Sequence, residues 1–136
     1  MISTAEVSKA DNASLGSILI VDDDRSVADT FSRLLTLEGY EVTTALDPAV
    51  GLELAESIRP GAIILDLRMP LISGIQFLRA VRARPSLAHI PIAIVTGDFF
   101  LSDDLMAEVG TLGAELRFKP MWVEDLVELA RTLTPR

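Results

Sequence analysis

The feature that most constrains this chain is the regular alternation of short apolar runs with longer stretches of helical periodicity. Each run is three or four residues long and most are rich in Ile, Leu or Val, which is typical of strands buried on both faces. Strands separated by helices pair in parallel, because the helical crossover returns the chain to the same end of the sheet. The runs occupy residues 18–21, 42–45, 62–65, 92–95 and 116–118. We therefore predict five βα units in one doubly wound α/β domain with a five-stranded parallel sheet.

The segments between and after these runs carry the signals of helix starts and of amphipathic helices. Asp47 and Pro48 are typical of an N-cap and of the first helical position, and we expect this second helix to bury Val50, Leu54 and Ile58. The other four helices are predicted between the first two runs and over residues 74–83, 101–109 and 123–133. These five helices are enough to cover both faces of the sheet.

The length of 136 residues fits a single domain with a core of its own. Residues 1–16 are small and polar and lack the apolar segment of a secretory signal, so we expect a flexible leader at 1–16 and one domain at 17–136, with no room for an output domain. The absence of cysteine and of any membrane-length apolar run favours a cytoplasmic protein. The net charge of -8 argues against direct binding of nucleic acid.

Chemically active side chains follow four of the five predicted strands. Asp22 and Asp23 follow the first, Asp66 the third, Thr96 closes the fourth and Lys119 follows the fifth. Ligands bind outside the carboxyl ends of the strands in open α/β sheets, so we expect these side chains to converge at one edge. A single strand-end acid is usually a helix cap or a solvated loop residue, as Asp24 is expected to be, but three separate strand ends converging favour a functional site.

Carboxylates crowded at one edge repel one another and require a positive partner. Lys119 supplies one charge, and Mg²⁺ suits a site made of a few carboxylates, a backbone carbonyl and water. A carboxylate beside Mg²⁺, an ammonium and a hydroxyl favours acyl phosphate chemistry, in which Asp66 attacks a phosphoryl group, Lys119 neutralises its charge and Thr96 hydrogen-bonds one of its oxygens. The turn after Asp66 would allow the backbone carbonyl of Arg68 to face the metal.

A chain with these residues resembles the receiver domain of two-component response regulators, which has a flavodoxin-like fold. The resemblance runs from Ser17 nearly to the C-terminus and rests on the ordered motifs ILIVDDD, ILDLRMP with the following Ser-Gly, IAIVTG and FKP. It implies that Asp66 is the phosphoacceptor and that Mg²⁺ is bound by Asp23, Asp66 and the Arg68 carbonyl, with Asp22 nearby through water. Thr96 and Lys119 would then contact the phosphoryl group.

The family often carries an aromatic switch residue three positions before the lysine, where this chain has Leu116. Leucine cannot swing a ring between buried and exposed positions, so the usual coupling of threonine to an aromatic is not expected here. The loop after Thr96 instead carries Phe99 and Phe100, which either pack under the following helix or form an apolar docking face.

Arg68 and Asp98 lie two residues after Asp66 and Thr96, at positions that flank the phosphoryl group in this family. We hypothesise that the two side chains pair across the mouth of the site and screen attacking water. The alternative is two unrelated solvated charges, since exposed ion pairs contribute little.

The resemblance implies a stand-alone receiver that takes its phosphoryl group from a histidine kinase or a histidine phosphotransfer protein. The domain would catalyse this transfer and the slow hydrolysis of its own phosphoryl group without being a turnover enzyme. Its output would be a protein contact through the face formed by the helix at 101–109, the strand at 116–118 and the helix at 123–133, and the sequence leaves open whether the chain forms a homodimer.

Two alternatives to this interpretation have some support in the sequence. A receiver-like binding module that ignores phosphorylation is favoured only by Leu116. A phosphatase of the haloacid dehalogenase type would use the acids after the first strand, Asp22 to Asp24, but it leaves Asp66 unexplained and lacks a later acidic pair at a strand end.

Overall fold

The structure, a computed structural model, describes residues 15–69 and 73–135. Residues 1–14 of the expected leader, and Pro70 of the expected turn after Asp66, lie outside the described residues. Within the described part of the chain, no helix is long and apolar enough to cross a membrane. The cytoplasmic location expected from the sequence stays a prediction.

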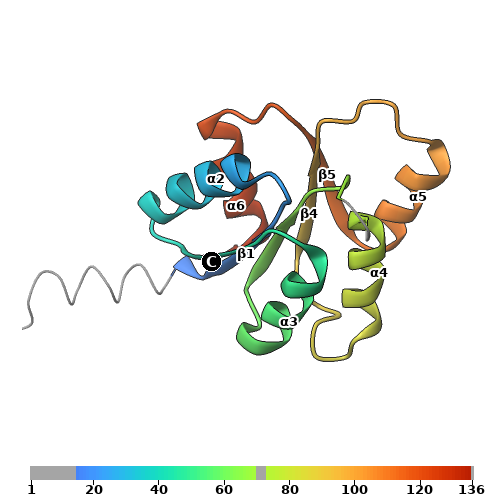
Figure 1. Ribbon diagram of the computed structural model, residues 1–136, viewed down its shortest axis with the longest axis horizontal. Coiled ribbons are helices and arrows are strands. Elements are labelled where there is room, and N and C mark those ends of the chain that lie inside the picture. The colour runs from blue at the N-terminus through green and yellow to red at the C-terminus, as the bar shows by residue number, and fades with distance from the viewer. Residues whose placement is uncertain (1–14, 70–72, 136) are drawn as a thin grey trace, which may run out of the picture.

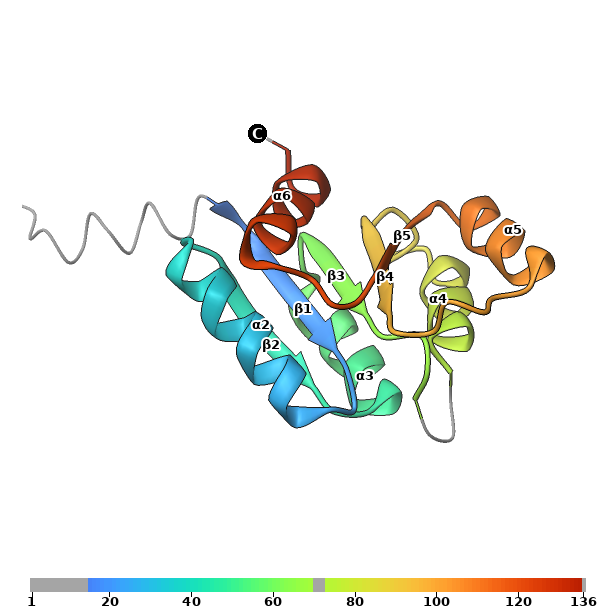
Figure 2. The ribbon, with the colours of Figure 1, turned by 90° about the horizontal axis from the view of Figure 1, so that it is seen from above.

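One parallel sheet of five strands forms the centre of the domain, in the order β2-β1-β3-β4-β5 (Figure 2). The strands are β1 (Ser17–Val21), β2 (Glu41–Ala45), β3 (Ala62–Leu65), β4 (Ile92–Thr96) and β5 (Ala114–Phe118). The helices between and after them are α2 (Arg25–Leu37), α3 (Pro48–Ile58), α4 (Gly74–Ala83), α5 (Asp103–Thr111) and α6 (Val123–Leu133). The predicted doubly wound α/β fold is confirmed.

The helices cover both faces of this sheet (Figure 1). Alternate residues of each strand point to opposite faces, so Leu19 and Val21 pack toward α3, α4 and α5 whereas Ile18 and Ile20 pack toward α2 and α6. The direction in which strands are added to the sheet reverses between β1 and β3. β2 pairs with one edge of β1, and β3 pairs with the other edge. Such a reversal opens a crevice at the carboxyl ends of the two central strands, which is where ligands bind in folds of this kind.

The buried face of α3 differs from the prediction. Asp47 caps this helix as expected, accepting a hydrogen bond of 2.9 Å from the Val50 amide. However, Val50 and Ile58 are 43% and 40% exposed, and the buried residues are Pro48, Gly51 and Ala55. A Cβ at Gly51 would lie only 2.9 Å from a methyl group of Val21, so α3 packs on the sheet through its smallest side chains. Leu54, the third residue predicted to be buried, is half-buried and packs against the core.

The start of α5 also differs from the prediction, by two residues. The expected helix began at residue 101, but Ser102 is the N-cap and its hydroxyl accepts a hydrogen bond of 3.1 Å from the Leu105 amide. A serine that caps a helix has extended backbone geometry, so the helix begins after it, at Asp103. The loop between β4 and α5 is correspondingly longer.

Arg82, near the end of α4, holds two loops against this helix by hydrogen bonds. Its guanidinium donates hydrogen bonds to the carbonyl oxygens of Leu112 at 2.7 Å, Ile90 at 2.7 Å, Ala88 at 3.1 Å and Gly113 at 3.4 Å. These carbonyls belong to the segment before β4 and to the turn before β5. One side chain therefore satisfies backbone acceptors from two connections that are distant in sequence.

We expect Arg82→Met to lower the free energy of unfolding by about 2 kcal/mol, because methionine keeps the aliphatic stem but leaves part-buried carbonyls without a donor. Urea denaturation followed by circular dichroism measures the change. The matched control is Arg84→Met, which breaks only the half-exposed pair with Glu56 and should change stability by less than about 1 kcal/mol. Equal effects of the two substitutions would contradict a structural role specific to Arg82.

Candidate functional site

The register of the sheet brings the predicted acids to one edge. Val21 is paired with both Ala45 and Leu65, so the residues that follow, Asp22 and Asp66, leave β1 and β3 side by side. The Asp66 amide donates to the Val21 carbonyl at 2.9 Å, which extends the ladder by one residue and holds the Asp66 backbone in place. A strand pairing therefore positions both carboxylates.

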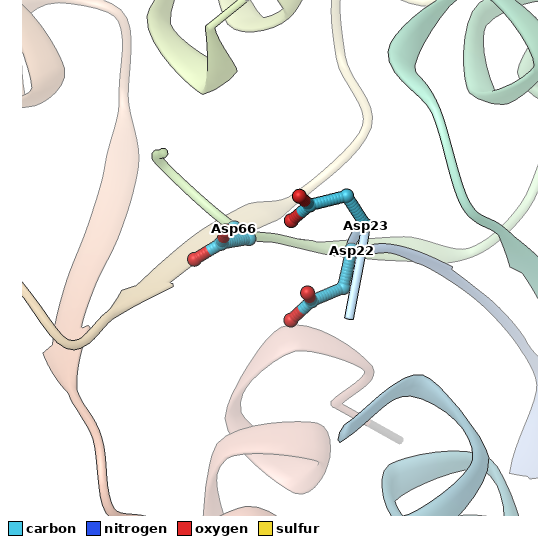
Figure 3. A group of neighbouring side chains, drawn as sticks. All are labelled: Asp22, Asp23 and Asp66. Carbon is cyan, nitrogen blue, oxygen red and sulfur yellow. The ribbon is translucent and has the colours of Figure 1, made fainter. Parts of the chain in front are cut away.

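Asp22, Asp23 and Asp66 form the acidic cluster of the site (Figure 3). One carboxylate oxygen from each lies within 4.8 Å of the others. Asp22 and Asp66 are buried, with 3% and 8% of their surface exposed, whereas Asp23 is exposed. Asp24 is not part of the cluster: its carboxylate accepts from the Ser26 amide at 3.0 Å as the N-cap of α2, as expected.

Lys119 reaches this cluster from the end of β5. Its Nζ donates to Asp22 at 3.0 Å and lies 3.4 Å from an oxygen of Asp66. Burial opposes the charged form of the ammonium, but the hydrogen bond to Asp22 and the charge of Asp66 together raise the pKa of Lys119. The lysine therefore stays protonated and holds the two buried carboxylates together.

The pKa of Asp66 lies above its usual value despite this lysine. Burial raises the pKa, the charge of Lys119 lowers it, and the charge of Asp22 raises it again, with a net shift upward. One ammonium shared by several carboxylates does not fully offset the cost of desolvating them. A further positive charge beside these carboxylates would therefore be electrostatically favourable.

Thr96 is fully buried at the end of β4 and is connected to two neighbours. Its carbonyl accepts from the Lys119 amide at 2.8 Å, and its Oγ1 accepts from the Asp98 amide at 3.1 Å. Since Oγ1 acts as an acceptor in that bond, the hydroxyl hydrogen is available to another acceptor. Thr96 therefore links the strand that ends beside the acids to the loop that follows.

Arg68 and Asp98 form the ion pair expected across the mouth of the site. Arg68 Nε donates to Asp98 Oδ2 at 2.8 Å, joining the loop after β3 to the loop after β4. A hydrogen bond from the Phe100 amide and the bond from Arg68 lower the pKa of Asp98 below its usual value, so the Asp98 carboxylate is ionised at neutral pH. The predicted contact is present, whereas the metal-binding role of the Arg68 carbonyl stays a prediction.

Gly74 places the first turn of α4 directly against the phosphoacceptor candidate. Its amide donates to the Leu67 carbonyl at 2.8 Å, and a Cβ at this position would lie 2.3 Å from the Asp66 carbonyl oxygen and 2.8 Å from the Leu67 Cα. No side chain fits there without moving backbone. The Ser-Gly that follows the ILDLRMP motif is thus explained by packing, with Ser73 as the N-cap of α4.

The acidic cluster fits a divalent cation with oxygen ligands. Three carboxylates offer oxygens within 4.8 Å of one another, and burial has raised the pKa of Asp66 in a way that a bound cation would reverse. Asp23 is the exposed member, so it leaves one side of the cluster open to solvent. A hard cation that keeps several waters is compatible with this arrangement.

Phe99 and Phe118 form a contact that the sequence did not lead us to expect. Their rings stack with centroids 5.2 Å apart and planes 17° from parallel. Phe99 and Phe100 are 61% and 93% exposed, so neither packs under α5, while Leu116 packs against the core. The β4–β5 register pairs Thr96 with Phe118, which brings the loop after Thr96 beside that ring, and this pairing is a property of the sheet and not of a local sequence pattern.

Similarity to known proteins extends over most of the chain. A family model described as response regulator receiver domain matches residues 18–131, which include every residue of the site. Among solved structures, chemotaxis protein CheY4 from Vibrio cholerae superposes with a TM-score of 0.79 at 32% sequence identity, covering 86% of this chain and 97% of that chain. The similarity to this structure therefore covers most of both chains.

Curated relatives show the same similarity over part of their length. The chain is 34% identical over 119 residues to transcriptional regulatory protein PrrA from Mycobacterium leprae, covering 88% of this chain and 50% of that protein. It is also 34% identical over 122 residues to response regulator MprA from Mycolicibacterium vanbaalenii, again covering 88% and 50%. The chain thus spans about half the length of the curated relatives it matches.

Proposed function

The chain belongs to the response regulator receiver domain family, and from that premise we propose that Asp66 is the residue that accepts the phosphoryl group in two-component signalling. The observation that carries this proposal is the position of Asp66 at the end of β3, with Asp22 and Asp23 beside it and the Lys119 ammonium 3.4 Å away. The comparisons favour neither a phosphatase nor a phosphorylation-independent module.

In the proposed transfer, a carboxylate oxygen of Asp66 attacks the phosphorus of a phosphohistidine in a histidine kinase or a phosphotransfer protein. A P–O bond forms at Asp66 as the P–N bond of the donor breaks, and the imidazole leaves with the electron pair of that bond. Lys119 offsets the charge on the phosphoryl oxygens, and the free hydroxyl hydrogen of Thr96 is donated to one of them. Hydrolysis later returns Asp66 to its carboxylate form.

The cation proposed for the acidic cluster is Mg²⁺. Asp23, Asp66 and the Arg68 carbonyl are the proposed direct ligands, with Asp22 acting through water. When bound, the metal neutralises charge on the phosphoryl group and lowers the repulsion among the carboxylates. Asp22 is already engaged by Lys119 at 3.0 Å and by the Asp24 amide at 2.9 Å, which supports its indirect role.

The proposed output is a protein contact through the face formed by α5, β5 and α6. The amide of Lys119 and the carbonyl of Thr96 join the ends of β4 and β5, so a shift of either residue toward a phosphoryl group is passed to this face. Because Leu116 is packed against the core, the loop after Thr96 is the element proposed to move.

The experiment that tests the function is intact-mass measurement after incubation with acetyl phosphate, with Mg²⁺ and with EDTA in its place. We expect a single phosphoryl adduct that forms only with Mg²⁺ and that disappears on incubation at alkaline pH, as an acyl phosphate should. If a correctly folded protein gives no adduct in either buffer, Asp66 is not a phosphoacceptor.

The pair between Arg68 and Asp98 gives a further prediction about the lifetime of that adduct. Arg68→Ala should speed loss of the phosphoryl group by up to about fivefold, because an exposed pair is worth at most about 1 kcal/mol and its loss opens the mouth to water. Asp98→Ala should have the same effect, and the double variant should be no faster than either single one. The decay of the adduct by mass spectrometry measures the rate.

The matched control for this pair is Arg79→Ala, which breaks an exposed ion pair with Glu108 away from the site. It should leave the decay rate unchanged. A decay rate in Arg68→Ala equal to that of the wild type would show that the pair does not screen water.

A further inference from the structure

Exposed aromatic side chains are concentrated beside the proposed phosphorylation site. Of the seven aromatic residues, three are buried in the core and four are exposed by more than a third of their surface. The exposed ones are Phe99, Phe100, Phe118 and Trp122. All four lie at or after the carboxyl ends of β4 and β5, the segments that carry Thr96 and Lys119.

Phe99, Phe100 and Phe118 are here called the aromatic surface, and the rings of Phe99 and Phe118 are held against each other before any partner arrives. The stack of Phe99 on Phe118 joins the loop to the edge strand β5, and the Phe100 amide donates to Asp98 Oδ1 at 2.9 Å. Asp98 is in turn held by Arg68. Pre-organised, exposed aromatic side chains lose little entropy on binding and are enriched where proteins contact one another.

Two exposed carboxylates follow the aromatic loop in the chain. Asp103 and Asp104 in the first turn of α5 are exposed, and within the described part of the chain neither has a cation at ion-pair distance. The nearby cation Arg68 is already paired with Asp98. An apolar surface followed in the chain by unpaired carboxylates is complementary to a segment with an apolar stripe and flanking lysines or arginines.

We propose that the aromatic surface binds a basic amphipathic segment of the downstream partner protein. This inference deepens the proposed function, because it names the kind of partner that reads the phosphorylated state. A second copy of the chain is a poorer occupant, since two chains of net charge -8 would bring Asp103 and Asp104 toward one another's acids. An anionic lipid surface is repelled for the same reason.

The surface is next to the site, so the two are expected to be coupled. Phe99 and Phe100 directly follow Asp98, whose amide is bonded to Thr96 Oγ1 at 3.1 Å, and Phe118 precedes Lys119 in the chain. A phosphoryl group that draws in Thr96 and Lys119 therefore changes the position of the rings. By linkage, a segment that binds the rings then has different affinities for the phosphorylated and the unphosphorylated chain.

Isothermal titration calorimetry of the full chain against a short amphipathic Leu/Lys peptide tests the proposal. The peptide should bind saturably with a one-to-one stoichiometry, and a Leu/Glu peptide of the same pattern should not bind. Phe100→Ser should weaken binding by about tenfold without changing net charge, because the side chain is a central anchor. The control Leu37→Ser removes another exposed apolar residue, 79% exposed on α2, and should leave the affinity unchanged.

The charge component has its own matched pair of variants. Asp104→Lys should weaken binding of the Leu/Lys peptide by about threefold more than Asp29→Lys, an equal reversal of charge on α2. Loss of affinity that is equal at Phe100 and Leu37, or binding of the Leu/Glu peptide, would overturn the proposal, as would a lack of saturable binding. Dimers in sedimentation that Phe100→Ser dissociates would assign the surface to a second copy and overturn it as well.

The titration is done without a phosphodonor, so its result does not depend on Asp66. Peptide binding in a chain that forms no phosphoryl adduct would contradict the phosphoacceptor function but support the proposed role of the aromatic surface. An adduct without peptide binding would contradict only the proposed role of the aromatic surface.

Discussion

Asp66→Asn is expected to abolish the Mg²⁺-dependent phosphoryl adduct while the protein stays folded. Asparagine has the shape of aspartate, but its amide is not a nucleophile toward phosphorus and it binds Mg²⁺ poorly. The fold should not suffer, because Lys119 keeps Asp22 as its partner at 3.0 Å. Intact mass after incubation with acetyl phosphate measures the adduct, and circular dichroism checks the fold.

The stability of Asp66→Asn follows from the sign of the pKa shift. Burial raises the pKa of Asp66, so the ionised carboxylate lowers folding stability at neutral pH, and this penalty fades as the pH falls through the raised pKa. Asparagine removes the penalty. In metal-free buffer at neutral pH, the variant should therefore need the same or more urea to unfold than the wild type.

The neighbouring acids supply the controls for this substitution. Asp23→Asn should keep some adduct and require more Mg²⁺ to form it, because one proposed ligand is lost but the nucleophile remains. An adduct that persisted in Asp66→Asn and vanished in Asp22→Asn would refute the assignment of Asp66 and return the phosphatase-like chemistry to consideration.

Gly74→Ala is expected to destabilise the domain by about 3 kcal/mol and to displace the Asp66 backbone. The new methyl group would lie 2.3 Å from the Asp66 carbonyl oxygen, and backbone cannot rotate away as a flexible side chain can. The start of α4 or the end of β3 must move to accommodate it. Urea denaturation measures the stability, and the yield of phosphoryl adduct in the remaining folded protein should fall as well.

Gly110→Ala is the matched control for this glycine. It lies inside α5, and a Cβ there meets nothing within 4 Å, so alanine should stabilise the helix by about 0.5–1 kcal/mol. A loss of stability at Gly74 no larger than the change at Gly110 would show that the close approach of α4 to Asp66 is not a real constraint.

Much of the candidate site was predictable because its residues occupy strand ends. Asp22, Asp66, Thr96 and Lys119 each close or follow an apolar run, and a parallel sheet brings all carboxyl ends to one edge. The pairing of Arg68 with Asp98 was hypothesised from their positions after Asp66 and Thr96, and the structure confirms the contact. The roles of these residues in phosphotransfer stay predictions until the chemistry is measured.

Other features were not predictable from local patterns. The burial of α3 depends on which face fits closest to Val21, and small residues such as Gly51 and Ala55 give no hydrophobic signal of the usual kind. Helical periodicity alone favoured the larger Val50 and Ile58, which are exposed instead. Close packing of a helix on a sheet is decided by shape as well as by hydrophobicity.

Short-range patterns in the sequence predicted the alternation of strands and helices, the cap at Asp47, and the chemical groups at the strand ends. These depend on short-range periodicity and on hydrogen bonds between residues a few positions apart. The stack of Phe99 on Phe118 and the hydrogen bonds from Arg82 to the turn before β5 depend on tertiary packing, since they join segments far apart in the chain. Their geometry depends on the order of the strands and the packing of the helices, and no local pattern encodes it.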